Sequence, residues 1–426
     1  PIFDLGNQYL SGRFPSKEES FSLKAPLQLV KCNDNQNNSA CGLLQLKHTA
    51  DLNNMYGETY GYRSGLNESM IEHLREIVSN AEKLVNLFPG DVILDIGSSD
   101  GTLLNMYHRI GIRKVGIDPA AEKFKEYYSQ DIDLITDFFS ADKLKQNYLD
   151  KKAKIITSIA MFYDLEEPMK FVRDIKEILH PDGIWICEQS YMPKMLKVNS
   201  FDTICQEHLE YYSLKQFEWM LNKAGLKIFD VEFNNINGGS FMIYVCHNDN
   251  NRKININQLD EIRKYEASLG LDTAKPFDEF KERVIKIKEQ LRNFLVSEKL
   301  KGRKIHVYGA STKGNVLLQF FNINNDLIDM AADRNNDKWG KLTPGTNIPI
   351  VSEEESRRNN PDYFLVLPWH FKEGFIQREE NFLRNRGKFI FPLPQPEIIS
   401  FDPLIGMLKS NPLSSQNFNN LRDLIL

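Results

Sequence analysis

The sequence predicts an α/β protein in which two parallel-sheet units follow a small N-terminal region rich in loops and β-strands. Compact apolar runs that suit buried strands alternate with helical segments from residue 91 to residue 246. A second strand-turn-helix unit begins at Lys304, after a long amphipathic segment. Residues 1–69 consist instead of short apolar stretches broken by Gly, Pro, Asn and Ser. We therefore expect three domains, over residues 1–69, 70–248 and 249–426.

The elements of the first α/β unit can be placed in order. Apolar residues at helical spacing predict a helix from Glu68 to about Phe88, and the run Asp91–Ile96 predicts a buried strand. Alternating strands and helices after it indicate a parallel sheet that ends in a hairpin. The further strands are expected at residues 114–117, 154–159, 183–188 and 241–246, and two helices at 166–179 and 214–224.

The second unit follows an Asn-rich boundary at residues 248–257. Apolar residues in steps of three and four predict one long helix across residues 277–294, which ends at Gly302. A strand at residues 304–308 then runs into a small-residue turn at Gly309. A helix at residues 316–321 and strands near 327–332 and 363–367 complete the prediction.

Composition narrows the function. The chain of 426 residues is 41% hydrophobic, enough for a sizeable core, and has 53 Lys+Arg against 58 Asp+Glu. A net charge of -5 without a basic stripe argues against nucleic-acid binding. No apolar run approaches the roughly 18 to 20 residues of a membrane helix, and no leader is evident. The five cysteines are widely spaced and odd in number, so we expect a reducing, cytoplasmic setting.

A glycine-containing turn follows the first strand of the central unit. It reads Asp95-Ile-Gly97-Ser-Ser-Asp100-Gly101 and precedes a helix, so the backbone and the helix N-terminus can approach a ligand. A second strand ends in Asp118, where a carboxylate can accept two ribose hydroxyls. The glycines do not have the G-x-G-x-x-G spacing of a dinucleotide-binding loop, and the Lys-Ser/Thr pair of a triphosphate-binding loop is absent. The pattern fits S-adenosylmethionine (SAM); the alternative is an ordinary glycine turn of a doubly wound sheet.

D-I-G-x-x-D-G, with an acidic residue after the second strand, resembles the class I methyltransferase fold. The resemblance implies that the glycine loop passes the methionine part of SAM and that Asp118 holds the ribose. It places Asp137 and Phe138 near the adenine and the turn Ala160–Tyr163 opposite the sulfonium. The expected cofactor-binding residues are Asp95, Gly97, Asp100, Gly101, Asp118, Asp137, Phe138 and Ala160.

Further motifs carry polar groups that suit a substrate. The stretch Phe201–Ser213 contains acidic residues, tyrosines and His208, whose side-chain type suits proton abstraction near neutral pH. Read alone, this stretch is more typical of a solvated polar loop with His208 on its surface. The accompanying motifs are Tyr56–Gly65, Asn237-Gly-Gly-Ser-Phe-Met242, Gly309-Ala-Ser-Thr-Lys-Gly-Asn315, Asp333–Lys338 and Thr343–Thr346.

Together and in this order, these motifs resemble the three-domain nucleotide-sugar C-methyltransferases of deoxysugar pathways, of the 3-C-methyltransferase type. The resemblance covers nearly the whole chain. It implies a zinc-binding N-terminal domain, a central class I methyltransferase and a C-terminal Rossmann-like substrate-binding domain. It also implies deprotonation of a carbon next to the ketone of a nucleotide-linked 4-keto-6-deoxysugar, followed by attack of the enolate on the methyl group of SAM.

Carried over to this sequence, the resemblance assigns His208 as the base and Glu207 as an orienting carboxylate. Tyr60 matches a tyrosine that reaches over the pocket. Ser311 and Thr312 would help to hold the diphosphate or the sugar at a helix N-terminus. The alternative is a degenerate Rossmann unit in which this turn is only structural. The other expected substrate contacts are Tyr56, Arg63, Tyr163, Tyr211, Asn237, Lys313 and Asn315.

Two positions depart from the family pattern. Cys205 stands where characterised members have a tyrosine, and Met161 is near a position where they carry a histidine. Methyl transfer is unaffected, but O- or N-methylation of a nucleotide sugar stays open, as does a non-catalytic SAM-binding scaffold. A dehydrogenase is disfavoured because neither glycine loop has dinucleotide spacing.

The family binds one zinc ion through two cysteine pairs, and this sequence offers Cys32 and Cys41 on either side of a polar insert. Structural zinc takes four ligands, so these thiols would form half a site, and the second pair would have to lie in a stretch before Pro1. The alternative is two small buried residues that pack a β unit.

As partner we expect the nucleotide-linked sugar substrate. We expect the protein itself to be a monomer or a weak homodimer.

Overall fold

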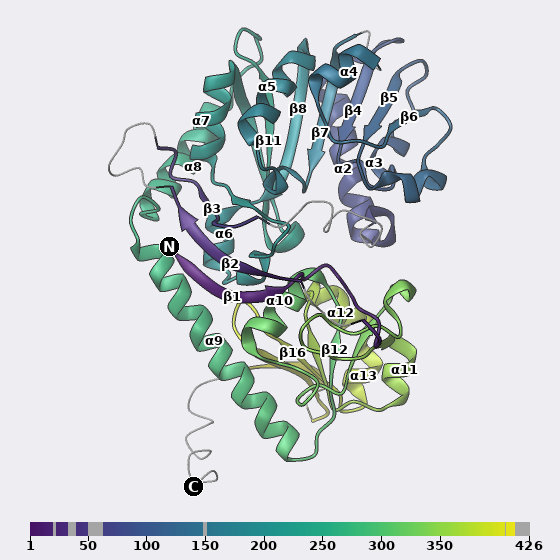
Figure 1. The fold of residues 1–426 in the computed structure, drawn as a ribbon, viewed down its shortest axis with the longest axis vertical. Coiled ribbons are helices and arrows are strands. Elements are labelled where there is room, and N and C mark those ends of the chain that lie inside the picture. Colours follow the sequence, from purple (N-terminus) through teal and green to yellow (C-terminus); the bar gives the residue numbers. More distant parts are fainter. Residues whose placement is uncertain (20–22, 33–39, 50–62, 148–150, 405, 414–426) are drawn as a thin grey trace.

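The computed structural model describes residues 1–19, 23–32, 40–49, 63–147, 151–404 and 406–413. These residues form three β-sheets. The central α/β unit lies at the top of Figure 1 and the C-terminal unit at the bottom, with the N-terminal strands between them. No helix in the described ranges has the length and apolar character needed to cross a membrane.

The N-terminal sheet is antiparallel and is completed by a strand from the central unit. Its strands pair in the order β1-β2-β3-β9. In the last pair Leu44 lies opposite Tyr211 and Gln45 opposite Glu210. The predicted small β-rich region is therefore present, but it includes residues far along the chain. The bounds are β1 Phe3–Tyr9, β2 Lys24–Lys31, β3 Leu44–Leu46 and β9 Glu210–Tyr211.

The central sheet has seven strands in the order β10-β11-β8-β7-β4-β5-β6. All run parallel except β11, which is antiparallel to both of its neighbours. This is the predicted parallel sheet with a closing hairpin. The bounds are β4 Val92–Ile96, β5 Arg113–Ile117, β6 Ile132–Ile135, β7 Ala153–Ile159, β8 Leu179–Ser190, β10 Leu226–Asn234 and β11 Ser240–His247.

Helices cover both faces of the central sheet, and a separate hydrophobic core lies on each face. Apolar side chains of α2 face one core, and those of α5 and α7 face the other. Leu259 and Ile262 of α8 also join the second core. The bounds are α2 Glu68–Leu84, α3 Thr102–Asn105, α4 Ala141–Asn147, α5 Pro168–Ile178, α6 Met192–Lys197, α7 Leu214–Ala224 and α8 Ile256–Ser268.

The C-terminal sheet is a second doubly wound unit, in the order β14-β13-β12-β15-β16-β17-β18. Its first five strands are parallel, β17 is antiparallel to β16, and β18 is antiparallel to β17. The bounds are β12 Ile305–Tyr308, β13 Met330–Asp333, β14 Ile350–Ser352, β15 Tyr363–Val366, β16 Lys388–Phe391, β17 Glu397–Asp402, β18 Met407–Pro412, α10 Thr312–Phe321, α11 Glu353–Arg358, α12 Lys372–Arg378 and α13 Glu380–Arg384.

The long helix α9 (Lys275–Leu300) joins the N-terminal and C-terminal parts. It extends beyond the predicted residues 277–294, and Gly302 follows it at a φ of 75°. One hydrophobic core runs from the N-terminal sheet through α9 to the C-terminal sheet. Within it the rings of Phe3 and Phe280 meet edge to face at 5.9 Å. The N-terminal sheet is therefore packed against the C-terminal unit and also paired to the central one.

Candidate active site

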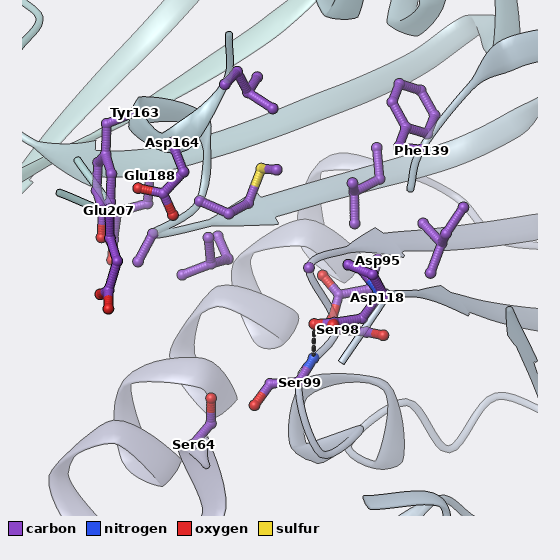
Figure 2. Close-up of a pocket in the computed structure, with 18 of the residues that line it drawn as sticks. Ser64, Asp95, Ser98, Ser99, Asp118, Phe139, Tyr163, Asp164, Glu188 and Glu207 are labelled. Atoms are coloured by element: carbon purple, nitrogen blue, oxygen red, sulfur yellow. Dashed lines mark hydrogen bonds between the residues drawn. The ribbon is translucent and has the colours of Figure 1, made fainter. Parts of the chain in front are cut away.

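A cavity of about 380 Å³ opens at the carboxyl ends of the central strands. Figure 2 shows side chains from the turns after β4, β5 and β7 pointing toward it. Its lining also includes Ser64 from the segment before α2, and Thr312 and Lys313 from the start of α10. The cavity therefore lies where the central and C-terminal units meet.

The turn after β4 brings the backbone to the cavity wall. Gly97 has a φ of 75°, and a Cβ there would lie 3.0 Å from Cγ of Met161. Ser99 is also left-handed, with a φ of 52°, and its backbone N–H donates to Oδ2 of Asp118 at 2.9 Å. The buried hydroxyl of Ser99 has no hydrogen-bond partner in the described chain. The turn is thus shaped for a close ligand that can satisfy this group.

Two carboxylates stand beside this turn. Asp118 also accepts a hydrogen bond from the N–H of Ala120 at 2.7 Å, and burial raises the pKa of its carboxyl. Asp95 accepts one from the Thr157 hydroxyl at 2.5 Å. Burial, opposed by that hydrogen bond, raises the pKa of Asp95 to about 7, and the charge of Asp118 adds to the rise. The two carboxylates suit a ligand that has hydroxyl donors and a positive charge, and SAM has both.

Aromatic side chains complete this end of the cavity. Phe138 lines it and is 48% exposed, and Phe139 lies beside it. Asp137 also lines the cavity but is hydrogen-bonded to Lys143 at 2.5 Å. The exposed ring of Phe138 is the surface most suited to stack on a planar base.

Two residues expected at the cofactor do not line the cavity. Asp100 accepts hydrogen bonds from the N–H of Gly65 at 3.0 Å and from the Thr102 hydroxyl at 2.6 Å. Gly101, with a φ of 73°, directly precedes α3 as its N-cap residue. These contacts hold the turn and the segment before α2 together, whereas Ala160, with a φ of 55°, does line the cavity.

His208 lies in the same cavity as a neutral imidazole. Its Nδ1 is 2.9 Å from the carbonyl oxygen of Thr203, which can only accept, so Nδ1 carries the hydrogen and Nε2 keeps a lone pair. Burial, aided by the positive charge of Lys313, lowers the pKa of His208 to about 3. Its ring lies 4.3 Å from that of Tyr163, which also lines the cavity.

Glu207 is the acidic neighbour of this imidazole. Burial raises the pKa of its carboxyl to about 7. A Cβ added at Gly12 would lie 2.3 Å from its Oε1 and 3.7 Å from the hydroxyl of Thr312. The N-terminal, central and C-terminal parts of the chain therefore meet at this carboxylate. The thiol of Cys205 beside it stays protonated because burial, together with the charge of Glu207, raises its pKa well above the usual value.

The remaining expected substrate residues divide into two groups. Asn237 and Lys313 line the cavity, and Nζ of Lys313 donates to the Asn237 carbonyl at 3.1 Å. Asn315 is fully buried and donates to the Ser11 carbonyl at 2.8 Å. Tyr211 donates to the His208 carbonyl at 3.1 Å and stays outside the cavity lining. Asn315 and Tyr211 are therefore placed to hold the N-terminal strand and the His208 backbone.

The N-terminal candidates lie elsewhere. The guanidinium of Arg63 covers the ring of Tyr127 at 3.7 Å and is 3.6 Å from Asp100, and it is not part of the cavity lining. Tyr56 and Tyr60 fall outside the described residues.

Glu188 was not singled out by sequence, although it lines the cavity at the end of β8. Its carboxylate is 2.8 Å from Nε2 of His73 and accepts from Asn234 at 2.7 Å. Burial works against a charged imidazole, but the hydrogen bond and charge of Glu188 raise the pKa of His73 overall. An acidic residue at the carboxyl end of a predicted parallel strand is the signal that could have found it.

Residues 66–231 match the family model of a methyltransferase domain, and residues 235–394 match that of a C-methyltransferase C-terminal domain. The C-methyltransferase NovU of Streptomyces niveus is 28% identical over 402 residues, which are 94% of this chain and 94% of NovU. Over nearly its whole length the chain is therefore similar to C-methyltransferases. These similarities indicate a SAM-dependent methyltransferase enzyme.

Two solved structures that are similar to this protein each align with less than half of it. A chain from the complex of the Haloferax volcanii Trm112 activator with a methyltransferase aligns with a TM-score of 0.35 at 16% identity, over 43% of this chain and 94% of that one. The plantazolicin methyltransferase BamL aligns with a TM-score of 0.35 at 15% identity, over 43% of this chain and 87% of its own.

The predicted metal site is not found in the described residues. Cys32 and Cys41 are close enough that the Cys32 thiol, after burial, contributes to the raised pKa of Cys41. Both are half-buried against the central core. In the parts of the chain that the structure describes, no cluster of three or more His, Cys, Asp or Glu side chains could hold a metal ion. Two thiols are half of the ligand set of structural zinc.

Proposed function

We propose that this enzyme methylates a carbon atom of a nucleotide-linked keto-deoxysugar. The observation that carries the proposal is the position of His208 and Glu207 in one cavity with the Gly97 turn and Asp118. A base close to a methyl donor is what methylation at an acidic C–H requires. The relatedness to C-methyltransferases favours carbon over oxygen or nitrogen as the acceptor.

The residues present suit SAM at one end of the cavity. Asp118 would accept the ribose hydroxyls, and the exposed face of Phe138 would stack on the adenine. When bound, SAM supplies an electrophilic methyl group on a positively charged sulfur. The turn Ala160–Tyr163, of which Ala160, Met161 and Tyr163 line the cavity, would face that methyl group.

His208 would act as the base. Nε2 removes a proton from the carbon next to the ketone, and the C–H electron pair becomes a carbon–carbon double bond while the carbonyl π pair moves onto oxygen. The low pKa of His208 belongs to the ligand-free cavity. An oxyanion that forms beside the ring favours the imidazolium, because opposite charges at close range raise a histidine pKa. Glu207, with a pKa of about 7, can then take up the proton.

The nucleotide part of the substrate would lie toward the C-terminal unit. Helix α10 begins after Ser311, whose hydroxyl accepts from the N–H of Gly314 at 3.1 Å. Thr312 follows at the cavity wall. A helix N-terminus of this kind suits the diphosphate of a nucleotide sugar.

The test uses His208→Asn in the full-length enzyme, with SAM and a panel of dTDP-, GDP- and CDP-linked keto-deoxysugars. We expect at least a ~100-fold loss of methyl transfer, because general base catalysis contributes roughly that much. SAM affinity by calorimetry should be unchanged. His108→Asn, at an exposed histidine outside the cavity, is the control.

The position of the new methyl group decides the acceptor. Carbon methylation predicts that the wild type exchanges the hydrogen next to the ketone in deuterated water, and that the product keeps its methyl group after acid hydrolysis. A methyl group on oxygen or nitrogen would contradict our proposal. So would SAM binding without turnover of any sugar in the panel, which would indicate a scaffold.

A further inference from the structure

Lys313 enters the cavity of the central unit from the C-terminal unit. It lies in the first turn of α10 and lines the cavity with Glu207 and His208. Its Nζ donates to the Asn237 carbonyl at 3.1 Å. No carboxylate of the described chain lies within 4.0 Å of this Nζ. An ammonium has three N–H donors, so the described surroundings leave two of them for a ligand.

The acid whose charge acts on Lys313 is occupied by other groups. Asp202 is fully buried, and its carboxylate accepts from the Ser200 hydroxyl at 2.9 Å and from the Trp369 indole N–H at 2.9 Å. Asp202 therefore favours the charged form of the lysine without forming an ion pair with it. Burial lowers the pKa of Lys313, while the charge of Asp202 opposes that change.

The positive charge of Lys313 acts on His208, the proposed base. After burial, it is the next cause of the low pKa of His208, and it also lowers that of His370. The positive charge of Lys313 disfavours protonation of His208 in the ligand-free enzyme. It would favour the same proton transfer once a negative charge forms between them.

The backbone that carries Lys313 is held firmly. Ser311 caps the helix, and Asn315, one turn from Ser311, is tied to the Ser11 carbonyl. A Cβ added at Gly314 would lie 2.6 Å from Leu367, so the helix start packs closely against β15 and its turn. A donor fixed in this way needs little rearrangement as charge develops.

We propose that Lys313 donates a hydrogen bond to the ketone oxygen of the substrate, and so stabilises the enolate, instead of binding the diphosphate. This assignment rests on the proposed function. As His208 takes the proton, the carbonyl π pair moves to oxygen beside the ammonium. The carbonyl re-forms when the carbon bonds to the methyl group, and the C–S pair stays on sulfur. Lys313 keeps its own proton throughout.

Lys313→Met in the full-length enzyme tests the assignment. The assay follows exchange of the hydrogen next to the ketone in deuterated water, with S-adenosylhomocysteine in place of SAM, so that enolisation is measured without methyl transfer. We expect exchange to slow by about 10² to 10³, as for the loss of one oxyanion donor. The affinities for SAM and for the free nucleoside diphosphate should change by less than about threefold.

Lys299→Met is the matched control, because Lys299 is also a half-buried lysine of the C-terminal part but pairs with Asp329 at 2.6 Å, away from the cavity. It should exchange at the wild-type rate. If Lys313→Met does not bind SAM, Lys313→Gln, which keeps a neutral donor toward Asn237, replaces it with the same expected loss of exchange.

Normal exchange by either Lys313 variant would overturn the assignment. If the affinity for the nucleoside diphosphate also fell tenfold or more, Lys313 would be a diphosphate contact. Failure of the proposed function looks different: the wild type would then exchange no hydrogen of any keto-sugar in the panel while still binding SAM.

Discussion

The central and C-terminal units share a strand-turn-helix corner with a glycine turn and an acidic residue after the second strand. In the central unit Asp118 accepts from the N–H of Ser99 at 2.9 Å. In the C-terminal unit Asp333, at the end of β13, accepts from the N–H of Ala310 at 2.8 Å. The two corners are thus built by the same hydrogen bond between an acidic residue and a turn.

What differs is the space in front of the turn. The central turn opens onto the cavity. In the C-terminal corner a Cβ at Gly309 would lie 2.6 Å from Pro368, and Lys338 donates to the Ala310 carbonyl at 2.8 Å and to Asp333 at 3.4 Å. Side chains of the protein therefore occupy the place that a ligand would take. A corner of this type can bind a ligand or fasten a domain, and its neighbours decide which.

Asp118→Asn should have the largest effect on ligand binding. The change removes a charged acceptor that would hold ribose hydroxyls, and hydrogen bonds to charged groups contribute about 1.5 to 3 kcal/mol. We expect SAM affinity to fall by about ten- to a hundredfold, measured by calorimetry. An unchanged dissociation constant would remove Asp118 from the cofactor site.

Asp333→Asn should act on stability instead. The side-chain amide of asparagine has only one acceptor oxygen, so its NH2 group would face one of the donors, Lys338 or the Ala310 N–H. That donor would be left unsatisfied, at a cost of about 1 to 3 kcal/mol. We expect a lower free energy of unfolding in denaturant and unchanged SAM affinity. A loss of SAM affinity equal to that of Asp118→Asn would mean that the C-terminal corner also serves the cofactor.

Gly12→Ala tests the point where both units meet the N-terminal segment. Its methyl group would lie 2.3 Å from Oε1 of Glu207, so the carboxylate must move. We expect turnover to fall by about tenfold, since a displacement of about 1 Å can cost more than that. The melting temperature should hold, because a flexible side chain can yield. Gly374→Ala, with open space around its Cβ, is the control, and equal turnover in both variants would contradict a role for Glu207.

The pH dependence of stability should show the smallest effect. Burial raises the pKa of Glu207 from 4.5 to about 7, so the folded state holds this proton more tightly, and stability falls as pH rises across that interval. His306 of the C-terminal unit has the opposite sign, because burial lowers its pKa to about 4. When the pH rises from 5 to 8, the calorimetric melting temperature of Glu207→Gln should therefore fall by less than that of the wild type, or rise by more. An unchanged difference would show that Glu207 is solvated.

The sequence predicted that the glycine turn and Asp118 lie side by side in the fold. Strand and helix periodicity together place Gly97 and Asp118 at the same edge of a parallel sheet, because the carboxyl ends of parallel strands meet there. The sheet order and the turns confirm this arrangement. The motif around His208 also reaches this cavity, although no local pattern predicts where so irregular a segment runs.

Side-chain direction could not be predicted in the same way. Asn315 and Lys313 are two residues apart on one helix, yet one binds the Ser11 carbonyl and the other faces the cavity. The direction of each depends on which distant segment packs against α10. The contact of Glu188 with His73 was missed for a related reason, since it joins residues 115 apart that share no motif.

The two-residue strand β9 has a consequence for protein engineering. It begins two residues after His208, and it closes the N-terminal sheet through its pairing with β3. In a chimera that joins the N-terminal region of one relative to the rest of another near residue 69, β3 would pair with a β9 from a different protein. The weaker pairing would loosen the segment that carries His208. Exchange of substrate specificity between relatives should therefore succeed only when the N-terminal sheet and the segment from Phe201 to Ser213 are transplanted together.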